Sequence, residues 1–209
     1  MTQDRRRPGL GKAGPGREAR PSGPPPGVAK LEEAAVAHLA RFAATEAGLR
    51  RVLARRVDRW ARAAEAEGRE DTAQLAAAAR ALVAEVAKRM VARGAVDDAA
   101  FAESRAKRLL RAGRSRRAAL AHLREKGVDA GTAAAALPEG EEAELAAALA
   151  FCRRRRIGPF AAGEAAGPEA RAKALGALAR AGFGREVAGR ALRMDPAEAE
   201  AKLLAARQG

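Results

Sequence analysis

The sequence predicts an all-α protein built from tandem helical units. One observation is an internal echo, in which five positions recur at a constant offset of 55 residues. The two copies are Leu120, Leu123, Gly127, Val128 and Leu137, followed by Leu175, Leu178, Gly182, Phe183 and Leu192. A repeat of this length is typical of one supersecondary unit used several times, which gives an elongated working surface rather than a pocket. The other observation is that alanine is dense after residue 27 and no alternating strand pattern interrupts it.

The composition indicates a polyanionic partner. The 209 residues include 40 Lys and Arg against 26 Asp and Glu, a formal net charge of +14. An excess of this size favours contact with nucleic-acid phosphates, made directly or through a nucleoprotein. Because the chain has five Phe, one Trp and no Tyr, stacking of bases on aromatic side chains is not expected to be the main mode of binding.

Residues 1–27 are rich in Pro, Gly and Arg and are predicted to form a disordered basic tail. The first helical repeat is assigned to residues 28–93. Its apolar residues fall on three helical stripes, namely Leu31, Ala35, Leu39 and Phe42; Leu49, Val52, Leu53, Val57 and Trp60; and Leu75, Leu82, Val86 and Met90. Asp71 with Gln74 predicts a capping box at the start of the helix that carries the third stripe, and Gly94 predicts the end of that helix.

The second repeat is assigned to residues 94–138 and the third, with a C-terminal helix, to residues 139–209. In the second repeat the predicted N-caps are Asp97, Ser115 and Asp129. In the third repeat helices are expected over 141–156, 169–181 and 185–194, and a last one begins after Asp195-Pro196. Each unit is expected to be a long helix followed by a helix-turn-helix pair.

Three segments of the second repeat carry a family signature. They are residues 93–102, with Gly94, Asp97-Asp98 and Phe101-Ala102; residues 114–120, which begin a basic helix; and residues 123–128, which end in Lys126-Gly127-Val128. Together they resemble the RecX family, the regulators of RecA recombinase. The third repeat, with Leu178, Arg180, Gly182, Phe183 and Gly184, and the first, with Leu39-Ala40-Arg41, Thr45 and Leu49, also resemble that family. The chain departs from it at Ala95-Val96, where an aromatic residue usually precedes the two aspartates, and at Gly113-Arg114-Ser115.

The resemblance covers roughly residues 30 to 193. It implies an elongated, curved array of three three-helix, helix-turn-helix-like repeats. It also implies a cytoplasmic protein that binds the RecA–DNA filament in its groove, in DNA repair and the SOS response. There it would suppress ATP hydrolysis, strand exchange and co-protease activity without chemistry of its own. We expect the protein to be a monomer.

Basic side chains recur in all three repeats and are the candidate contacts to filament or DNA. A charge run is usually a solvated face, so the hypothesis depends on the set rather than on any one member. The candidates are Arg50, Arg51, Arg55, Arg105, Arg108, Arg111, Arg116, Arg117, Arg124, Arg153, Arg154 and Lys173. The central contact is assigned to Arg105, Arg108, Arg111, Arg116 and Arg117.

No catalytic, metal-binding or cofactor-binding arrangement is predicted. His38 and His122 lie in different repeats without neighbouring ligands, and Cys152 is expected to be a buried apolar residue. No apolar run approaches the roughly 18 residues of a membrane span. The alternative function is an independent basic helix-turn-helix DNA-binding or nucleoid-associated protein. Against sequence-specific readout, the short helix 129–137 carries no Arg, Asn or Gln.

Overall fold

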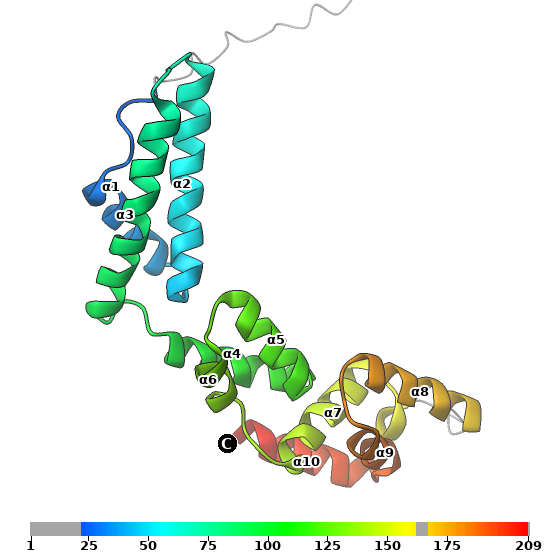
Figure 1. Ribbon diagram of the computed structural model, residues 1–209. Helices are drawn as coiled ribbons and strands as arrows, with labels where there is room; N and C mark the ends of the chain where they lie inside the picture. The colour runs from blue at the N-terminus through cyan, green and yellow to red at the C-terminus, as the bar shows by residue number, and fades with distance from the viewer. Residues whose placement is uncertain (1–21, 162–166, 209) are drawn as a thin grey trace, which may run out of the picture.

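The computed structural model describes residues 22–161 and 167–208 (Figure 1). These residues form ten α-helices and one 3-10 turn and contain no β-strand, which confirms the all-α prediction. Most of the predicted tail lies outside the described residues. The helices gather around three hydrophobic cores, and we call the three consecutive groups of helices modules. Within the described ranges, no helix combines the length and apolar character needed to cross a membrane.

The first module is a long helical hairpin with a shorter helix against it. Its helices are α1 (Val28–Leu39), α2 (Glu46–Ala66) and α3 (Thr72–Ala92). The antiparallel α2 and α3 have 21 residues each, a length of about 30 Å. The sequence predicts a long helix followed by a pair of short helices in each unit. That prediction is wrong for this module, where the short helix comes first and two long helices follow. Small buried residues such as Ala64 and Ala76 continue the apolar contact to the hairpin tip, so the pair does not break into shorter helices.

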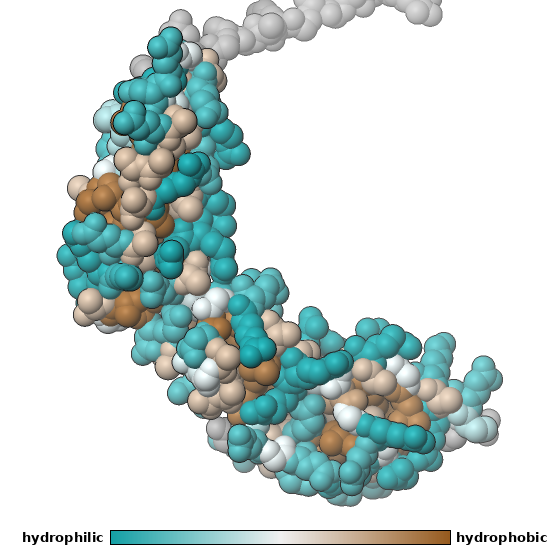
Figure 2. All heavy atoms as spheres, viewed as in Figure 1, coloured by the Kyte–Doolittle hydropathy of each residue, from teal (hydrophilic) through white to brown (hydrophobic). Residues whose placement is uncertain are grey.

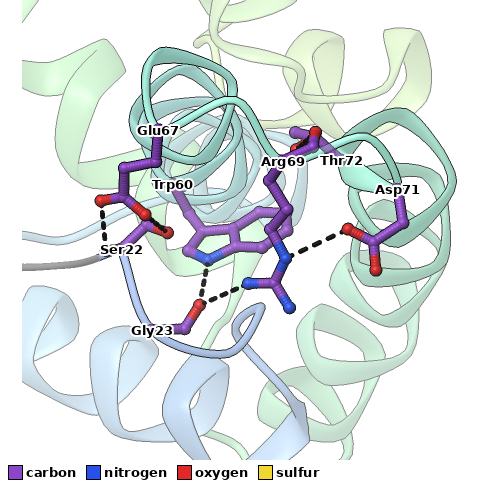
Figure 3. A network of polar contacts seen from close by, with 7 residues as sticks. All are labelled: Ser22, Gly23, Trp60, Glu67, Arg69, Asp71 and Thr72. Atoms are coloured by element: carbon purple, nitrogen blue, oxygen red, sulfur yellow. Dashed lines mark hydrogen bonds and ion pairs between the residues drawn. The ribbon is translucent and has the colours of Figure 1, made fainter.

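The end of the predicted tail is held at this tip (Figure 3). The indole N–H of Trp60 donates to the carbonyl of Gly23 at 3.1 Å, and Arg69 donates to the same oxygen at 3.0 Å. Ser22 donates its backbone N–H and its hydroxyl to Glu67, each at 2.6 Å. Composition alone assigned Ser22 and Gly23 to a disordered segment, whereas the buried indole N–H needs an acceptor and finds it there.

Two local predictions for the first module are wrong. Asp71 does not cap α3, because its carboxylate lies 3.1 Å from Nε of Arg69 and its backbone is not extended. Thr72, the first residue of α3, instead donates its hydroxyl to the Arg69 carbonyl at 2.7 Å. Phe42 does not join the core, because α1 ends three residues earlier and its side chain is 52% exposed.

The second module contains three short helices whose starts are capped as predicted. They are α4 (Asp98–Arg111), α5 (Arg116–Lys126) and α6 (Ala130–Ala135). Asp97 accepts from the N–H of Ala100 at 2.9 Å, and Ser115 accepts from that of Ala118 at 3.2 Å. Asp129 accepts two N–H groups at the start of α6. These bonds satisfy donors that a helix start leaves without an intrahelical partner.

The third module is built around one apolar helix. Its elements are α7 (Glu141–Arg155), the 3-10 turn η1 (Gly158–Phe160), α8 (Pro168–Arg180), α9 (Arg185–Arg193) and α10 (Pro196–Gln208). Because α7 contacts α4, α9, α10 and η1, its residues 147–152 are all buried. Asp195 caps α10 by accepting from the N–H of Ala197 at 2.8 Å, as predicted.

The two copies of the echo adopt one conformation. Gly127 and Gly182 end α5 and α8 with φ of 93° and 94°, a region that side chains rarely enter. In each copy the residue after the glycine donates its N–H to the buried leucine five positions earlier, namely Val128 to Leu123 and Phe183 to Leu178, both at 3.1 Å. The echo is therefore a helix stop with a fixed turn. Its residues are scaffold rather than contact surface.

The modules follow one another along a curve (Figure 1). The middle helix of each module, α2, α5 or α8, lies towards the inner side of this curve, and α6 and α10 lie towards the outer side. We call the side that the three middle helices line the inner surface. The chain is thus an elongated array, as the repeat predicts.

Candidate interaction surface

Each middle helix carries two basic residues spaced seven positions apart. They are Arg55 and Arg62 on α2, Arg117 and Arg124 on α5, and Lys173 and Arg180 on α8. Seven residues are nearly two helical turns, so the members of a pair share one face about 10 Å apart. We call these three pairs the inner pairs.

The inner pairs face away from the cores. On α5 the buried residues are Ala119 and Leu123, and helical geometry puts Arg117 and Arg124 on the other side of the helix. The same relation holds on α2 and α8, and all six side chains are exposed. Figure 2 shows that hydrophilic side chains cover much of the inner side of the curve. None of the six forms a hydrogen bond or ion pair through its side chain with another described residue.

Four of the inner-pair residues were candidates from the sequence, and two were missed. The missed ones are Arg62 and Arg180. The available signal was the repeated spacing of seven, measured from Arg55 and from Lys173. Neither missed residue lies in a run of basic residues, so the local density of positive charge does not indicate them.

Five other candidates are engaged within the protein. Arg51 donates to the carbonyl of Lys126 at 2.8 Å, and Arg105 donates to Nε2 of His122 at 3.0 Å. The remaining three arginines make four contacts, which join Arg111 to the Arg207 carbonyl at 3.3 Å, Arg116 to the carbonyls of Pro138 and Ala134 at 3.3 and 3.5 Å, and Arg153 to Glu200 at 3.4 Å. These contacts connect helices to one another, so each of these arginines has a structural role.

The structure does not gather the five central candidates into one cluster. Arg111 reaches towards the end of α10 and Arg116 towards the end of α6, whereas Arg117 belongs to the inner pair of α5. Arg108 is exposed on α4, beside a hollow of about 660 Å³ between the first two modules. Among the other candidates, Arg50 is exposed on α2, and the guanidinium of Arg154 lies 5.8 Å from the Phe151 ring centre.

The first joint between modules is made by the start of α2. The hydroxyl of Thr45 accepts from the N–H of Gly48 at 2.9 Å and donates to the carbonyl of Lys126 at 2.6 Å. One residue later, the N–H of Glu46 donates to Asp98 at 2.8 Å. Thr45 is only 1% exposed. Its buried hydroxyl therefore caps α2 and also bonds to the next module.

The second joint repeats this arrangement at the start of α5. Ser115 caps α5 and donates its hydroxyl to the carbonyl of Ala181 at 2.8 Å, and it is fully buried. The N–H of Arg116 donates to Glu144 on α7 at 2.8 Å. At both joints the accepting carbonyl immediately precedes a glycine of the echo. The sequence indicated Ser115 as a cap but not as a joint, because that role requires the position of the next module.

The echo glycines also allow the modules to approach closely. A Cβ on Gly127 would lie 2.3 Å from Cβ of Ala47, and one on Gly182 would lie 2.7 Å from the Ser115 hydroxyl oxygen. Both distances are below van der Waals contact. A side chain at Gly127 would push the Ala47 backbone away and separate the modules, and one at Gly182 would displace the Ser115 hydroxyl. The joints therefore set how the inner pairs are placed relative to one another.

Burial perturbs the pKa of a histidine and of a cysteine. Burial, and then the charge of Arg105, lowers the pKa of His122 from its ordinary value. Burial raises the pKa of the Cys152 thiol to about 12. A lower pKa keeps the imidazole neutral, as an acceptor for Arg105 must be, and a higher one keeps the thiol protonated. Across the residues that the structure describes, no group of three or more His, Cys, Asp or Glu is placed to hold a metal ion.

Comparison with known proteins identifies the family. Residues 97–137, which span the second module, match the family model of the second three-helix domain of RecX. The regulatory protein RecX of Myxococcus xanthus is 38% identical over 169 residues, or 80% of this chain and 86% of that protein. The regulatory protein RecX of Agrobacterium fabrum is 39% identical over 106 residues, or 51% of this chain and 56% of that protein. No solved structure gives a significant match. Because the Myxococcus relative aligns over most of both chains, this chain belongs to the RecX family of regulatory proteins.

Proposed function

We propose that this chain is an inhibitory regulator of RecA that lodges in the groove of the RecA–DNA filament, in DNA repair and the SOS response. It acts in the cytoplasm as a monomer, without a cofactor, and suppresses ATP hydrolysis, strand exchange and co-protease activity. The observation that carries the proposal is the set of three inner pairs on the inner surface.

A repeat array and a filament can match one another in periodicity. A filament of protein on DNA presents the same anionic groups again and again along its length. An array with one exposed basic pair on each of three successive modules meets such a partner at several places at once. A single exposed ion pair contributes at most about 1 kcal/mol, so binding depends on several pairs acting together.

The second candidate function is independent DNA binding through the helix-turn-helix pairs. Basic side chains support contact with phosphates. Readout of bases is not supported, because α6 has six residues with the sequence Ala-Gly-Thr-Ala-Ala-Ala. None of these side chains forms the bidentate contacts that distinguish base pairs. DNA binding without sequence preference remains the competing outcome in the experiment.

The test is the DNA-dependent ATPase of RecA with this protein titrated in. Inhibition at a small fraction of the RecA concentration supports the proposal. The double substitution Arg117→Glu with Arg124→Glu is expected to raise the half-inhibitory concentration by at least about tenfold, or about 1.4 kcal/mol. The matched control reverses Lys30 and Lys88, two exposed lysines of the first module, and is expected to change it by less than about threefold.

Two outcomes contradict the proposal. One is an unchanged ATPase together with tight binding to naked duplex DNA, which supports the second candidate. The other is equal loss of inhibition in the Arg117/Arg124 variant and the Lys30/Lys88 variant, which shows that only net charge matters. Circular dichroism of both variants checks that the helices remain folded.

A further inference from the structure

A groove on the other side of the array has an apolar floor. It lies between α4, α7 and α10, with a volume of about 610 Å³, and thus bridges the second and third modules. Its floor on α7 consists of Ala143, Ala146, Ala147 and Ala150, which share one helical face. Because alanine side chains are short, they leave a hollow between the longer side chains of the flanking helices.

Basic residues form the rim of this groove. They are Lys107 and Arg111 on α4, Arg153 on α7, and Lys202 and Arg207 on α10. The one acidic residue in the lining is Glu142. Lys202 is neutralised by Glu142 at 2.7 Å, and Arg153 is paired with Glu200 at 3.4 Å. The other three rim residues have no carboxylate partner among the described residues, so the groove carries uncompensated positive charge.

The geometry points to an acidic, amphipathic segment of a partner protein as the occupant of this groove. The apolar side chains of that segment fill the hollow over the alanines, and its carboxylates pair with Lys107, Arg111 and Arg207. This is the mode in which an amphipathic helix lies in an apolar groove. DNA is the less suitable occupant, because phosphates satisfy the rim but leave the apolar floor in contact with water. The inference is independent of the proposed role of the inner surface.

Leu203 on α10 is buried and lines the groove together with Ala206. A segment lying in the groove along α10 covers the apolar floor formed by the alanines of α7. Since the groove is walled by both α4 and α10, its occupant also holds the second and third modules together.

The experiment measures binding of defined probes to the full chain by fluorescence anisotropy. The main probe is a labelled synthetic helical peptide with leucines on one face and glutamates on the other. Polyglutamate serves as a probe of charge alone, and a labelled duplex oligonucleotide as a probe of phosphate binding. Ala146→Phe fills the groove, and its matched control is Ala81→Phe on the exposed side of α3.

Ala146→Phe is expected to lower the affinity for the leucine–glutamate peptide at least about tenfold while leaving polyglutamate and duplex binding unchanged. Ala81→Phe is expected to leave all three unchanged. Lys107→Glu is compared with Lys88→Glu, a charge reversal on the exposed surface of α3. Lys107→Glu is expected to weaken binding of the peptide several-fold more than Lys88→Glu does. This pair keeps the test valid even if Ala146→Phe disturbs folding.

Three results would overturn the inference. The first is an unchanged peptide affinity in a folded Ala146→Phe variant. The second is polyglutamate or the duplex binding as tightly as the peptide and losing as much affinity in that variant. The third is equal loss in the Lys107→Glu and Lys88→Glu variants, which shows attraction by net charge alone. None of these measurements includes RecA, so their failure leaves the proposed function untouched.

Discussion

Gly127→Ala tests whether close approach at the first joint holds the first two modules together. The added methyl carbon would lie 2.3 Å from Cβ of Ala47. Carbon atoms rest about 3.5–4.0 Å apart, so the two surfaces must separate by more than about 1 Å. That separation also stretches the 2.6 Å bond between Thr45 and the Lys126 carbonyl.

The expected cost combines two effects. A residue with a side chain at the φ of 93° found here is strained by about 1–2 kcal/mol. Forcing a methyl group into a filled contact costs about 1–3 kcal/mol more. The sum is a loss of about 2–5 kcal/mol in the free energy of unfolding. Ala47→Gly removes the opposing methyl, so in that background Gly127→Ala is expected to cost only the strain, about 1–2 kcal/mol.

The assay is equilibrium denaturant unfolding of the wild type, both single variants and the double variant, arranged as a double-mutant cycle. Gly68→Ala is the matched control, because φ is 76° there and an added Cβ has no atom within 4 Å. It is expected to show strain alone and no coupling to Ala47→Gly. Small-angle scattering should show a change of shape for Gly127→Ala and none for Gly68→Ala. Equal costs of Gly127→Ala in both backgrounds would refute steric contact as the reason for the glycine.

Three further predictions concern single side chains. Ser115→Ala removes a helix cap and the donor to the Ala181 carbonyl, so it is expected to lower the free energy of unfolding by about 1–3 kcal/mol, measured by the same denaturant titration. Because burial raises the pKa of Cys152 to about 12, its thiol is expected to react with a disulfide reagent at pH 8 far more slowly in the folded chain than in denaturant; equal rates contradict its burial. Because the pKa of His122 is lowered in the folded chain, the imidazole binds a proton more readily in the unfolded chain. The histidine therefore favours unfolding as the pH drops below about 6.5, where the unfolded imidazole becomes protonated. NMR titration should show the low pKa directly, and Arg105→Met should move it upwards.

Much of the fold followed from local chemistry that the sequence displays. Asp97, Ser115 and Asp129 cap helices because each short polar side chain precedes a helical run. The prediction failed where a competing partner was available. Asp71 has the residue type of a cap, but Arg69 lies two positions away and holds its carboxylate. Periodicity likewise suggested Phe42 as a core residue, although the helix had ended before it.

The candidate site was less predictable, because the sequence does not distinguish an arginine that donates to a carbonyl from one that is exposed to water. Arg116 and Arg117 are neighbours in a basic run, yet Arg116 contacts the end of α6 and Arg117 faces away from the core. Only the arrangement of the next elements separates the two roles. The spacing of seven between Arg117 and Arg124 is a sequence signal, but it gains meaning from the position of α5 on the inner surface (Figure 1).

Each joint needs a hydroxyl at the start of one middle helix and a closely packed glycine at the end of the next, and the two ends of the array each lack one of these parts. The middle helix of the first module also ends at a glycine with positive φ, Gly68, yet nothing surrounds it. The middle helix of the third module has Gly167 at its N-cap position, and glycine has no side chain to donate to a further carbonyl. By contrast, Thr45 and Ser115 each supply a buried hydroxyl to the module that follows.

This difference makes the array directional. A hydroxyl at the start of one middle helix meets the carbonyl before the glycine that ends the next, so each joint forms only when both helices are complete. Because the donor is also the cap of its own helix, the same atom stabilises a module and fixes the position of its neighbour. The spacing of the inner pairs on α2, α5 and α8 therefore depends on two buried hydroxyl groups. Substitutions at Thr45 or Ser115 should alter binding to a periodic partner without touching any residue of the inner surface.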